Sequence, residues 1–145
     1  MDGLRAKLND NGRAMFRLRR ILPVIGLIIG AWSVLPPYTG PSLNTETRVE
    51  VADHVVPGVV LIVLSVILVL LERQRSFSPT LRLAAGFATL LCGIWMTATH
   101  IPLVAQAMRN EVSAGVTANH TVPSLVVLVL GLTWVGAHWE QASEK

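Results

Sequence analysis

Charged residues are scarce in this chain, and cysteine is almost absent. Only 14% of the 145 residues are charged and 52% are hydrophobic, whereas about a quarter of a typical soluble domain is charged. Cys92 is the single cysteine, which excludes an intrachain disulfide and any CxxC motif for metal binding or redox chemistry. This composition indicates an integral membrane protein.

Four apolar runs contain no Asp, Glu, Lys or Arg, and they cover roughly residues 21–36, 55–71, 83–104 and 121–137. A membrane-spanning helix needs about 17–25 mostly apolar residues, so the last three runs fit and the first is slightly short. In a soluble helical bundle, each run would carry a polar stripe every three or four residues. We therefore predict an all-α integral membrane protein with four transmembrane helices.

Motifs of known enzyme classes are also missing. The sequence has no HExxH, no GxSxG and no glycine-rich phosphate loop. Ionisable residues inside membrane helices usually mark transport or proton relay, and the middle of each apolar run lacks them. We therefore expect neither an enzyme nor a stand-alone pump or channel, and the sequence identifies no soluble substrate.

The basic residues are distributed unequally between the two ends of the apolar runs. Ten of the twelve Lys and Arg residues lie in 1–20, in 73–82 or at Lys145, and only Arg48 and Arg109 lie in the other two loops. The positive-inside rule therefore predicts a multi-pass protein of the bacterial cytoplasmic (inner) membrane with both termini in the cytoplasm. The formal net charge of +3 follows from this asymmetry, and we predict no nucleic-acid partner.

An internal repeat divides the chain into two hairpins. Residues 51–60 (VADHVVPGVV) are echoed by residues 117–126 (TANHTVPSLV), and Gly30-x-Trp32 is echoed by Gly93-x-Trp95. Each copy has two apolar runs, so we predict parallel repeats related by a pseudo-twofold axis along the membrane normal. The predicted segments are a basic cytoplasmic N-terminal segment (1–20), two transmembrane hairpins (21–75 and 76–139) and a cytoplasmic tail (140–145).

Small residues are spaced for close helix contact in the first and third runs. Gly26-x-x-x-Gly30 is a small-xxx-small pattern, and Thr89-x-x-x-Gly93 repeats it. Such patterns let helix backbones approach closely in lipid. The sequence leaves two interpretations open: these residues pack the helices of this chain together, or they dock a partner subunit.

Two further groups of residues are expected near the membrane surfaces. Four tryptophans near helix ends are predicted to be interfacial anchors: Trp32, Trp95, Trp134 and Trp139. Pro57 and Pro123 are predicted in the first turn of their helices, with Asp53 and Asn119 just upstream as capping side chains. The lipid bilayer is thus one expected partner of the chain.

The histidines are the chemically most informative side chains. His54, His100 and His120 are predicted at the outer edge of the membrane, and His138 at the cytoplasmic side. Without a cofactor, each ring would be an amphipathic residue at the headgroup level. Two alternatives are a haem b held between His54 and His120, and a Zn or Cu ion held by His54, His100, His120 and Asp53. A proton-handling or pH-sensing role is a further alternative.

Within each repeat, a Gly-x-Trp pair is followed by a polar loop, a polar–His pair, a small residue and a long Val/Leu helix. The residues that carry this pattern are Gly30, Trp32, Pro36, His54 and Gly58 in the first copy, and Gly93, Trp95, His120 and Ser124 in the second. In this pattern the chain resembles the SPW-repeat membrane proteins of bacteria and archaea, although the Ser-Pro-Trp tripeptide itself is absent. The resemblance covers nearly all of the chain after the basic N-terminus. It implies membrane hairpins and no catalytic residues.

These features lead to three hypotheses about function. The first is a non-enzymatic accessory or structural subunit of a larger membrane complex (respiratory, transport or envelope assembly), docked through the small-residue faces and the outer loops 38–52 and 102–118. The second is a haem- or metal-binding electron-transfer protein that uses His54 and His120. The third is a four-span protein that self-associates through Gly26 and Gly30. A cofactor protein would be coloured or contain stoichiometric metal, whereas a docking subunit would copurify with other chains.

Overall fold

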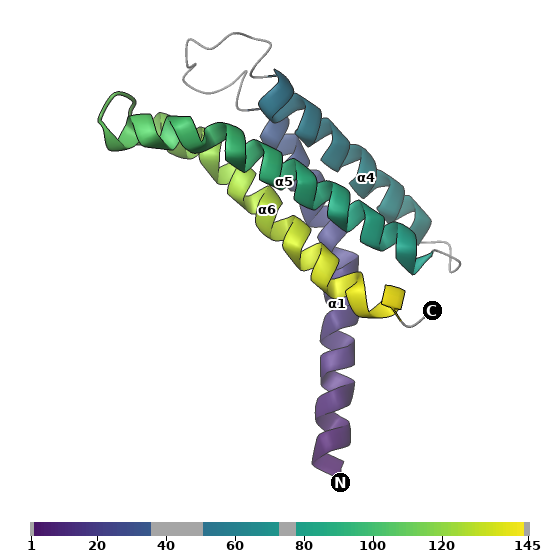
Figure 1. The fold of residues 1–145 in the computed structure, drawn as a ribbon. Helices are drawn as coiled ribbons and strands as arrows, with labels where there is room; N and C mark the ends of the chain where they lie inside the picture. The colour runs from purple at the N-terminus through teal and green to yellow at the C-terminus, as the bar shows by residue number, and fades with distance from the viewer. Residues whose placement is uncertain (1, 36–50, 73–77, 144–145) are drawn as a thin grey trace.

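The computed structural model describes residues 2–35, 51–72 and 78–143, and nearly all of these residues are helical (Figure 1). The helices are α1 (Asp2–Val34), α4 (Val56–Glu72), α5 (Pro79–Met108) and α6 (Ala114–Ser143), and a π-helical turn, η1 (Val51–Val55), leads directly into α4. No strand occurs in this part of the chain. The predicted all-α class is therefore confirmed.

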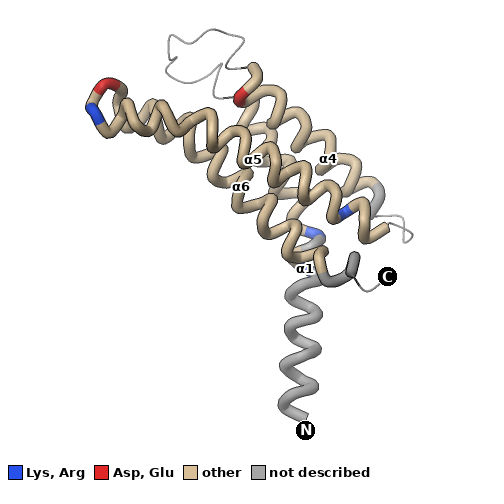
Figure 2. The backbone as a smooth tube through the Cα atoms, in the orientation of Figure 1, with Lys and Arg blue, Asp and Glu red and all other residues tan. Residues whose placement is uncertain are grey.

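Three helical stretches of the described chain are long and apolar enough to cross a membrane: Val51–Leu70, Pro79–Met108 and Ala114–Trp139. A fourth apolar stretch, Arg20–Val34, is shorter than a typical span. Figure 2 shows no charged residue along the middle of α4, α5 or α6 in the described chain, whereas in α1 charge lies midway along the helix, where its apolar stretch begins. These features make the chain a membrane protein, and three of its four predicted spans meet the length requirement.

The helices pack as two pairs, α1 with α4 and α5 with α6 (Figure 1). α1 and α6 join the two pairs, whereas α4 and α5 touch less extensively. The apolar core between the helices contains Leu22, Ile29, Leu61, Leu68, Ala85, Met96, Val127, Leu130, Trp134 and Ala137. Each helix therefore contributes to a single core, and the loosest seam of the bundle lies between α4 and α5.

Glycines bring the helices of each pair into backbone contact. A Cβ atom on Gly30 would lie 2.9 Å from the Gly58 carbonyl oxygen, and one on Gly93 would lie 2.5 Å from backbone atoms of Leu128. A larger residue at either position would force the helices apart. All four residues of the predicted small faces, Gly26, Gly30, Thr89 and Gly93, are buried. They therefore pack helices of this chain together, as in the first of the two interpretations left open by the sequence.

The second outer loop is much shorter than predicted. We expected a loop over 102–118, but α5 continues to Met108 and α6 begins at Ala114. α1 likewise extends beyond its apolar run and begins at Asp2. Hydropathy marks the part of a helix that contacts lipid, whereas the helix itself continues as long as its backbone hydrogen bonds are favourable. The first predicted outer loop, 38–52, lies mostly outside the described residues.

The predicted capping roles of Asp53 and Asn119 are wrong. Asp53 lies within η1, and Asn119 lies inside α6, so Pro123 is also well inside its helix. In a regular α-helix, Pro57 would have no N–H for the Asp53 carbonyl, and its ring would clash there. The wider π-helical turn immediately before α4 accommodates this proline. η1 therefore takes the place of a capped helix start.

Candidate functional site

Three histidines from three different helical elements meet inside the bundle. His54 lies in η1, His100 in α5 and His120 in α6. The ring centroid of His54 is 4.8 Å from that of His100 and 5.4 Å from that of His120, and the His100 and His120 centroids are 6.4 Å apart. All three residues are at least 95% buried. We call these three residues the histidine cluster.

Two rings of the cluster are held by their own helices. Nδ1 of His100 bonds to the Met96 carbonyl oxygen, and Nδ1 of His120 bonds to the Val116 carbonyl oxygen at 3.0 Å. A carbonyl oxygen can only accept a hydrogen bond, so each Nδ1 must carry the proton in a neutral ring. In each of these two neutral rings the lone pair therefore lies on Nε2, which is the atom that can bind a cation.

His54 is held differently. Its Nε2 lies 3.0 Å from Nε2 of His100, and since the His100 atom is an acceptor, the proton of His54 must lie on Nε2. Nδ1 of His54 is then a lone-pair acceptor, and it has no hydrogen-bond partner among the described residues. A buried polar atom without a partner costs about 1–3 kcal/mol. The cluster therefore contains one nitrogen whose bonding capacity is unused.

A carboxylate adjoins the cluster. The Asp53 side chain lies near the Thr99 hydroxyl, the Trp95 indole and His100, and the Thr99 hydroxyl donates to the Met96 carbonyl oxygen at 3.0 Å. The Thr99 hydroxyl is also 3.3 Å from Nδ1 of His100. All four residues predicted as metal ligands are thus brought into one region. Three of them converge as rings, and Asp53 lies at the edge.

A haem between His54 and His120 does not fit this geometry. Bis-histidine ligation needs two rings that face the iron from opposite sides of a flat macrocycle. The centroids of these two rings are only 5.4 Å apart at an interplanar angle of 73°, and the ring of His100 contacts His54 beside them. The side chains present leave no flat gap for a porphyrin between the two rings.

The fourth histidine lies away from the cluster, near the other end of α6. His138 is 1% exposed, and its Nδ1 bonds to the Trp134 carbonyl oxygen at 2.9 Å. It has the same ring, the same burial and the same type of backbone hydrogen bond as His120. His138 is therefore a matched control for the chemistry of the cluster.

The predicted tryptophan anchors divide into two groups. Trp32, Trp95 and Trp139 are 38%, 55% and 55% exposed, whereas Trp134 is 1% exposed and lies in the core. The expectation for Trp134 is corrected, because the absence of a side chain at Gly26 leaves space that the Trp134 ring approaches. Proximity to a helix end did not reveal which side of α6 faces the bundle.

Sequence reasoning missed several features of the site. The contact of His100 with His54 joins residues 46 positions apart, outside the repeat spacing that aligned His54 with His120. Thr99 and the carbonyl groups of Met96 and Val116 were not singled out either. Any histidine inside a helix can donate from Nδ1 to the carbonyl oxygen four residues earlier. His138, which lies outside the cluster, makes the same hydrogen bond. The sequence therefore contains no signal that separates the cluster from an isolated histidine.

Comparisons with known proteins do not add to this description. No known protein family, curated protein or solved structure matches the chain at a significant level. Membership of the SPW-repeat family stays a prediction. The functional argument therefore depends on the geometry of the histidine cluster.

Proposed function

We propose that this membrane protein binds a divalent transition metal ion, Zn²⁺ or Cu²⁺, through His54, His100 and His120. One observation carries the proposal: three imidazole rings from three helical elements converge, and two of them direct their protons to their own helices. Metal-binding histidines commonly use this arrangement, in which the second ring nitrogen donates to a carbonyl or carboxylate and orients the ring. Imidazole nitrogen is a preferred ligand of both metals.

The spacing of the rings supports the proposal. A tetrahedral Zn²⁺ with Zn–N bonds of about 2.0–2.1 Å separates its ligand nitrogens by about 3.3 Å and the ring centroids by about 5 Å. The Nε2 atoms of His54 and His100 are 3.0 Å apart, and the three centroid separations are 4.8, 5.4 and 6.4 Å. As the side chains stand, no group of three His, Cys, Asp or Glu residues in the described chain is placed to hold a metal ion, so binding requires rotations that turn three ring nitrogens toward one point. For His54 to bind through Nε2, its proton moves to Nδ1.

The donor set also bears on what the ion would do. Three histidines leave one position of a tetrahedral ion for water or an external ligand, as in sites that exchange ligands. Asp53 places a carboxylate beside His100, which favours a cation at the cluster. Bound zinc would supply Lewis-acid chemistry and bound copper would supply electron transfer. The identity of the metal therefore decides whether the electron-transfer hypothesis applies.

The test uses the full chain in detergent, stripped of metal with a chelator and titrated with Co²⁺, whose visible spectrum reports tetrahedral nitrogen coordination. Zn and Cu are also measured by elemental analysis in protein purified without a chelator. We expect one ion per chain in the parent. His54→Ala, His100→Ala and His120→Ala should each weaken binding at least about tenfold, and His138→Ala should not. No binding by the parent, or equal loss in all four variants, would overturn the proposal.

The orientation and the duplication remain part of the proposal. The positive-inside distribution of Lys and Arg favours both termini in the cytoplasm of a bacterium, with the cluster at the outer side. Reporter fusions at the two termini test this, and an extracytoplasmic signal from either would contradict it.

The two hairpins share one close helix contact at equivalent positions. Gly30 adjoins Ile62 in the first hairpin, and Gly93 adjoins Leu128 in the second. Gly93 follows Gly30 by 63 residues and Leu128 follows Ile62 by 66 residues, which are the spacings of the sequence repeat. An experimental structure in which the hairpins fail to superpose would exclude a shared origin.

A second candidate function is the accessory subunit, and the α5–α6 turn favours it. α5 continues beyond His100 to Met108, and it exposes Ile101 (63%) and Met108 (82%) there. Exposed large apolar side chains at the end of a span are candidates for contact with another chain. Copurification with other chains should be lost in the Ile101→Ser/Met108→Ser double variant and retained in Leu132→Ser, which alters a lipid-facing residue. Purification of the parent without any other chain would count against this role.

A further inference from the structure

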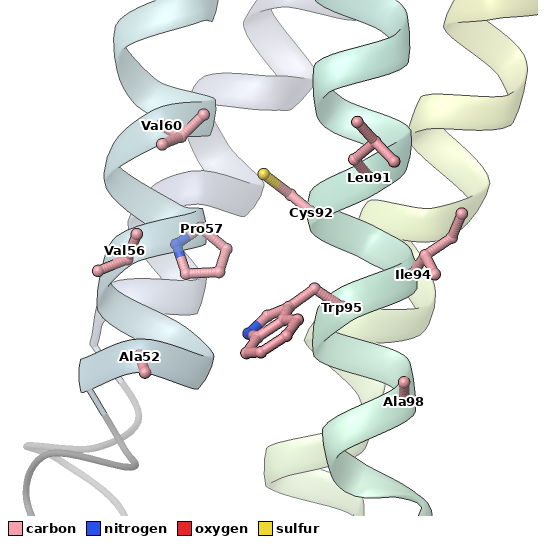
Figure 3. Close-up of a pocket in the computed structure, with 9 residues that line it drawn as sticks. All are labelled: Ala52, Val56, Pro57, Val60, Leu91, Cys92, Ile94, Trp95 and Ala98. Carbon is pink, nitrogen blue, oxygen red and sulfur yellow. The ribbon is translucent and has the colours of Figure 1, made fainter.

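A groove lies between α4 and α5, the two neighbouring helices that touch least (Figure 3). Its volume is about 660 Å³, within the range of about 300–1,000 Å³ found for small-molecule sites. Its walls include Val56, Pro57 and Val60 from α4, and Cys92, Trp95 and Ala98 from α5. We call it the α4–α5 groove.

The walls of the α4–α5 groove are almost wholly apolar. The Cys92 thiol and the Trp95 indole N–H are the only polar side-chain groups among the residues that line it. These residues belong to the spans Val51–Leu70 and Pro79–Met108, and Val56 and Trp95 are more than half exposed. The groove therefore opens to hydrocarbon, where water would lack hydrogen-bond partners. An apolar occupant is favoured.

Apart from the Cys92 thiol, the polar groups meet the groove at one end. The Trp95 indole, which lines the groove, also lies beside the Asp53 carboxylate, and Thr99 lies there as well. Farther from this end, the walls contain Val60 and Leu91 and offer no charged partner. This polarity matches a molecule with a polar head near Asp53 and an apolar chain directed toward the middle of the membrane.

The dimensions of the groove favour a lipid chain over a helix. Along α4, the lining residues run from Ala52 to Val60, a length of about 12 Å at a rise of 1.5 Å per residue. A helix seated along this stretch would contact the groove over only about two of its turns. A hydrocarbon chain is thinner and flexible, so it can follow the irregular wall between Pro57 and Trp95.

We propose that the α4–α5 groove is a binding site for an acyl chain of a membrane phospholipid, whose headgroup lies at the Asp53 end. The Asp53 end of the groove adjoins the histidine cluster, but occupancy of the groove does not require a metal ion. The leaflet that supplies the lipid is the one at the level of η1, because η1 contains Asp53.

Photocrosslinking tests this proposal in the intact protein. The full chain is reconstituted into phosphatidylcholine vesicles that contain a phosphatidylcholine with a diazirine within one acyl chain, and labelled residues are mapped by mass spectrometry. We expect labelling of Pro57 and Cys92, although Pro57 is buried and Cys92 is partly buried. Val129 is 61% exposed on the lipid-facing side of α6, and it reports labelling by bulk lipid.

Two variants fill the groove from opposite walls. Ala98→Trp and Val60→Trp should each reduce labelling of Cys92 several-fold, whereas Val129→Trp should leave it unchanged. Using both walls keeps the test decisive when one variant fails to fold. Labelling of Cys92 that persists in both filled variants would overturn the proposal. So would crosslinks from Cys92 to a second protein chain in native membranes, since they would assign the groove to a subunit.

Discussion

At the scale of single residues, most polar side chains in the spans bond to their own helix. The hydroxyls of Ser33, Thr121 and Thr133 donate to the carbonyl oxygens four residues earlier. Such bonds matter in a membrane, because the lipid core offers no alternative partner. Buried polar atoms without a partner among the described residues are His54 Nδ1, Ser65 Oγ and Thr97 Oγ1. His54 Nδ1 is the one histidine nitrogen among these buried atoms.

Replacement of His54 should cost less stability than replacement of His100 when the protein is free of metal. His100→Leu leaves the Nε2 proton of His54 without its acceptor, in addition to the unpartnered Nδ1, which predicts a loss of about 1–3 kcal/mol. His54→Leu removes both of those atoms and leaves only the His100 lone pair unsatisfied. The free energy of unfolding in detergent with a chelator checks this order. Equal losses, or a greater loss for His54→Leu, would contradict the hydrogen-bond assignment.

At the scale of elements, η1 sets the direction of the His54 side chain. The π-helical turn over Val51–Val55 precedes Pro57, which lacks the N–H that a regular helix would direct to Asp53. Inserted π-helical turns shift the face on which subsequent side chains lie and are frequent at functional sites. We therefore expect the position of His54 in the cluster to depend on Pro57, which follows the π-helical turn.

Pro57→Ala should weaken metal binding without removing a ligand. The alanine N–H can bond to the Asp53 carbonyl, which favours a regular α-helix and turns His54 away from His100. We expect a decrease of about 10–100-fold in Co²⁺ affinity, the range seen when residues that orient ligands are changed. Pro23→Ala is the control, because Pro23 lies inside α1, away from η1. Unchanged affinity in Pro57→Ala would show that the π-helical turn does not position His54.

At the scale of the whole molecule, the two helix pairs meet asymmetrically. α1 and α6 close one seam, whereas α4 and α5 leave the groove at the other. Close contacts within the bundle also cover the small residues that were considered for self-association. A Cβ atom on Gly26 would meet the side chains of Ser65 and Trp134. The proposed homodimer seam at Gly26 and Gly30 is therefore occupied by this chain's own helices.

Gly26→Ile should destabilise the fold without changing the oligomeric state. The larger side chain must displace Ser65 and Trp134, and overpacking of this kind costs about 1–3 kcal/mol. Gly136→Ile is the control, because no atom lies within 4 Å of a Cβ built at Gly136. Unfolding curves and the mass of the detergent-solubilised particle are measured together. A change from dimer to monomer with unchanged stability would restore the self-association hypothesis.

The sequence alone determined the membrane class and the helical content. Runs of apolar residues without charges cannot form a soluble bundle, and only helices satisfy the backbone within each run. The repeat also placed His54 and His120 at corresponding positions. These properties depend on local composition and spacing along one chain, which is why they could be predicted without the fold.

Only the tertiary structure decided which faces of the helices meet. The runs are apolar nearly all round, so no polar stripe marks the side that faces the bundle. The sequence therefore could not predict three features: the burial of Trp134, the contact of His100 with His54, and the groove between α4 and α5. Close approach at Gly30 and Gly93 sets the relative position of the helices within each pair. The packing between the pairs then brings three distant histidines together, because rotation about each helix axis is fixed by shape rather than by hydrophobicity.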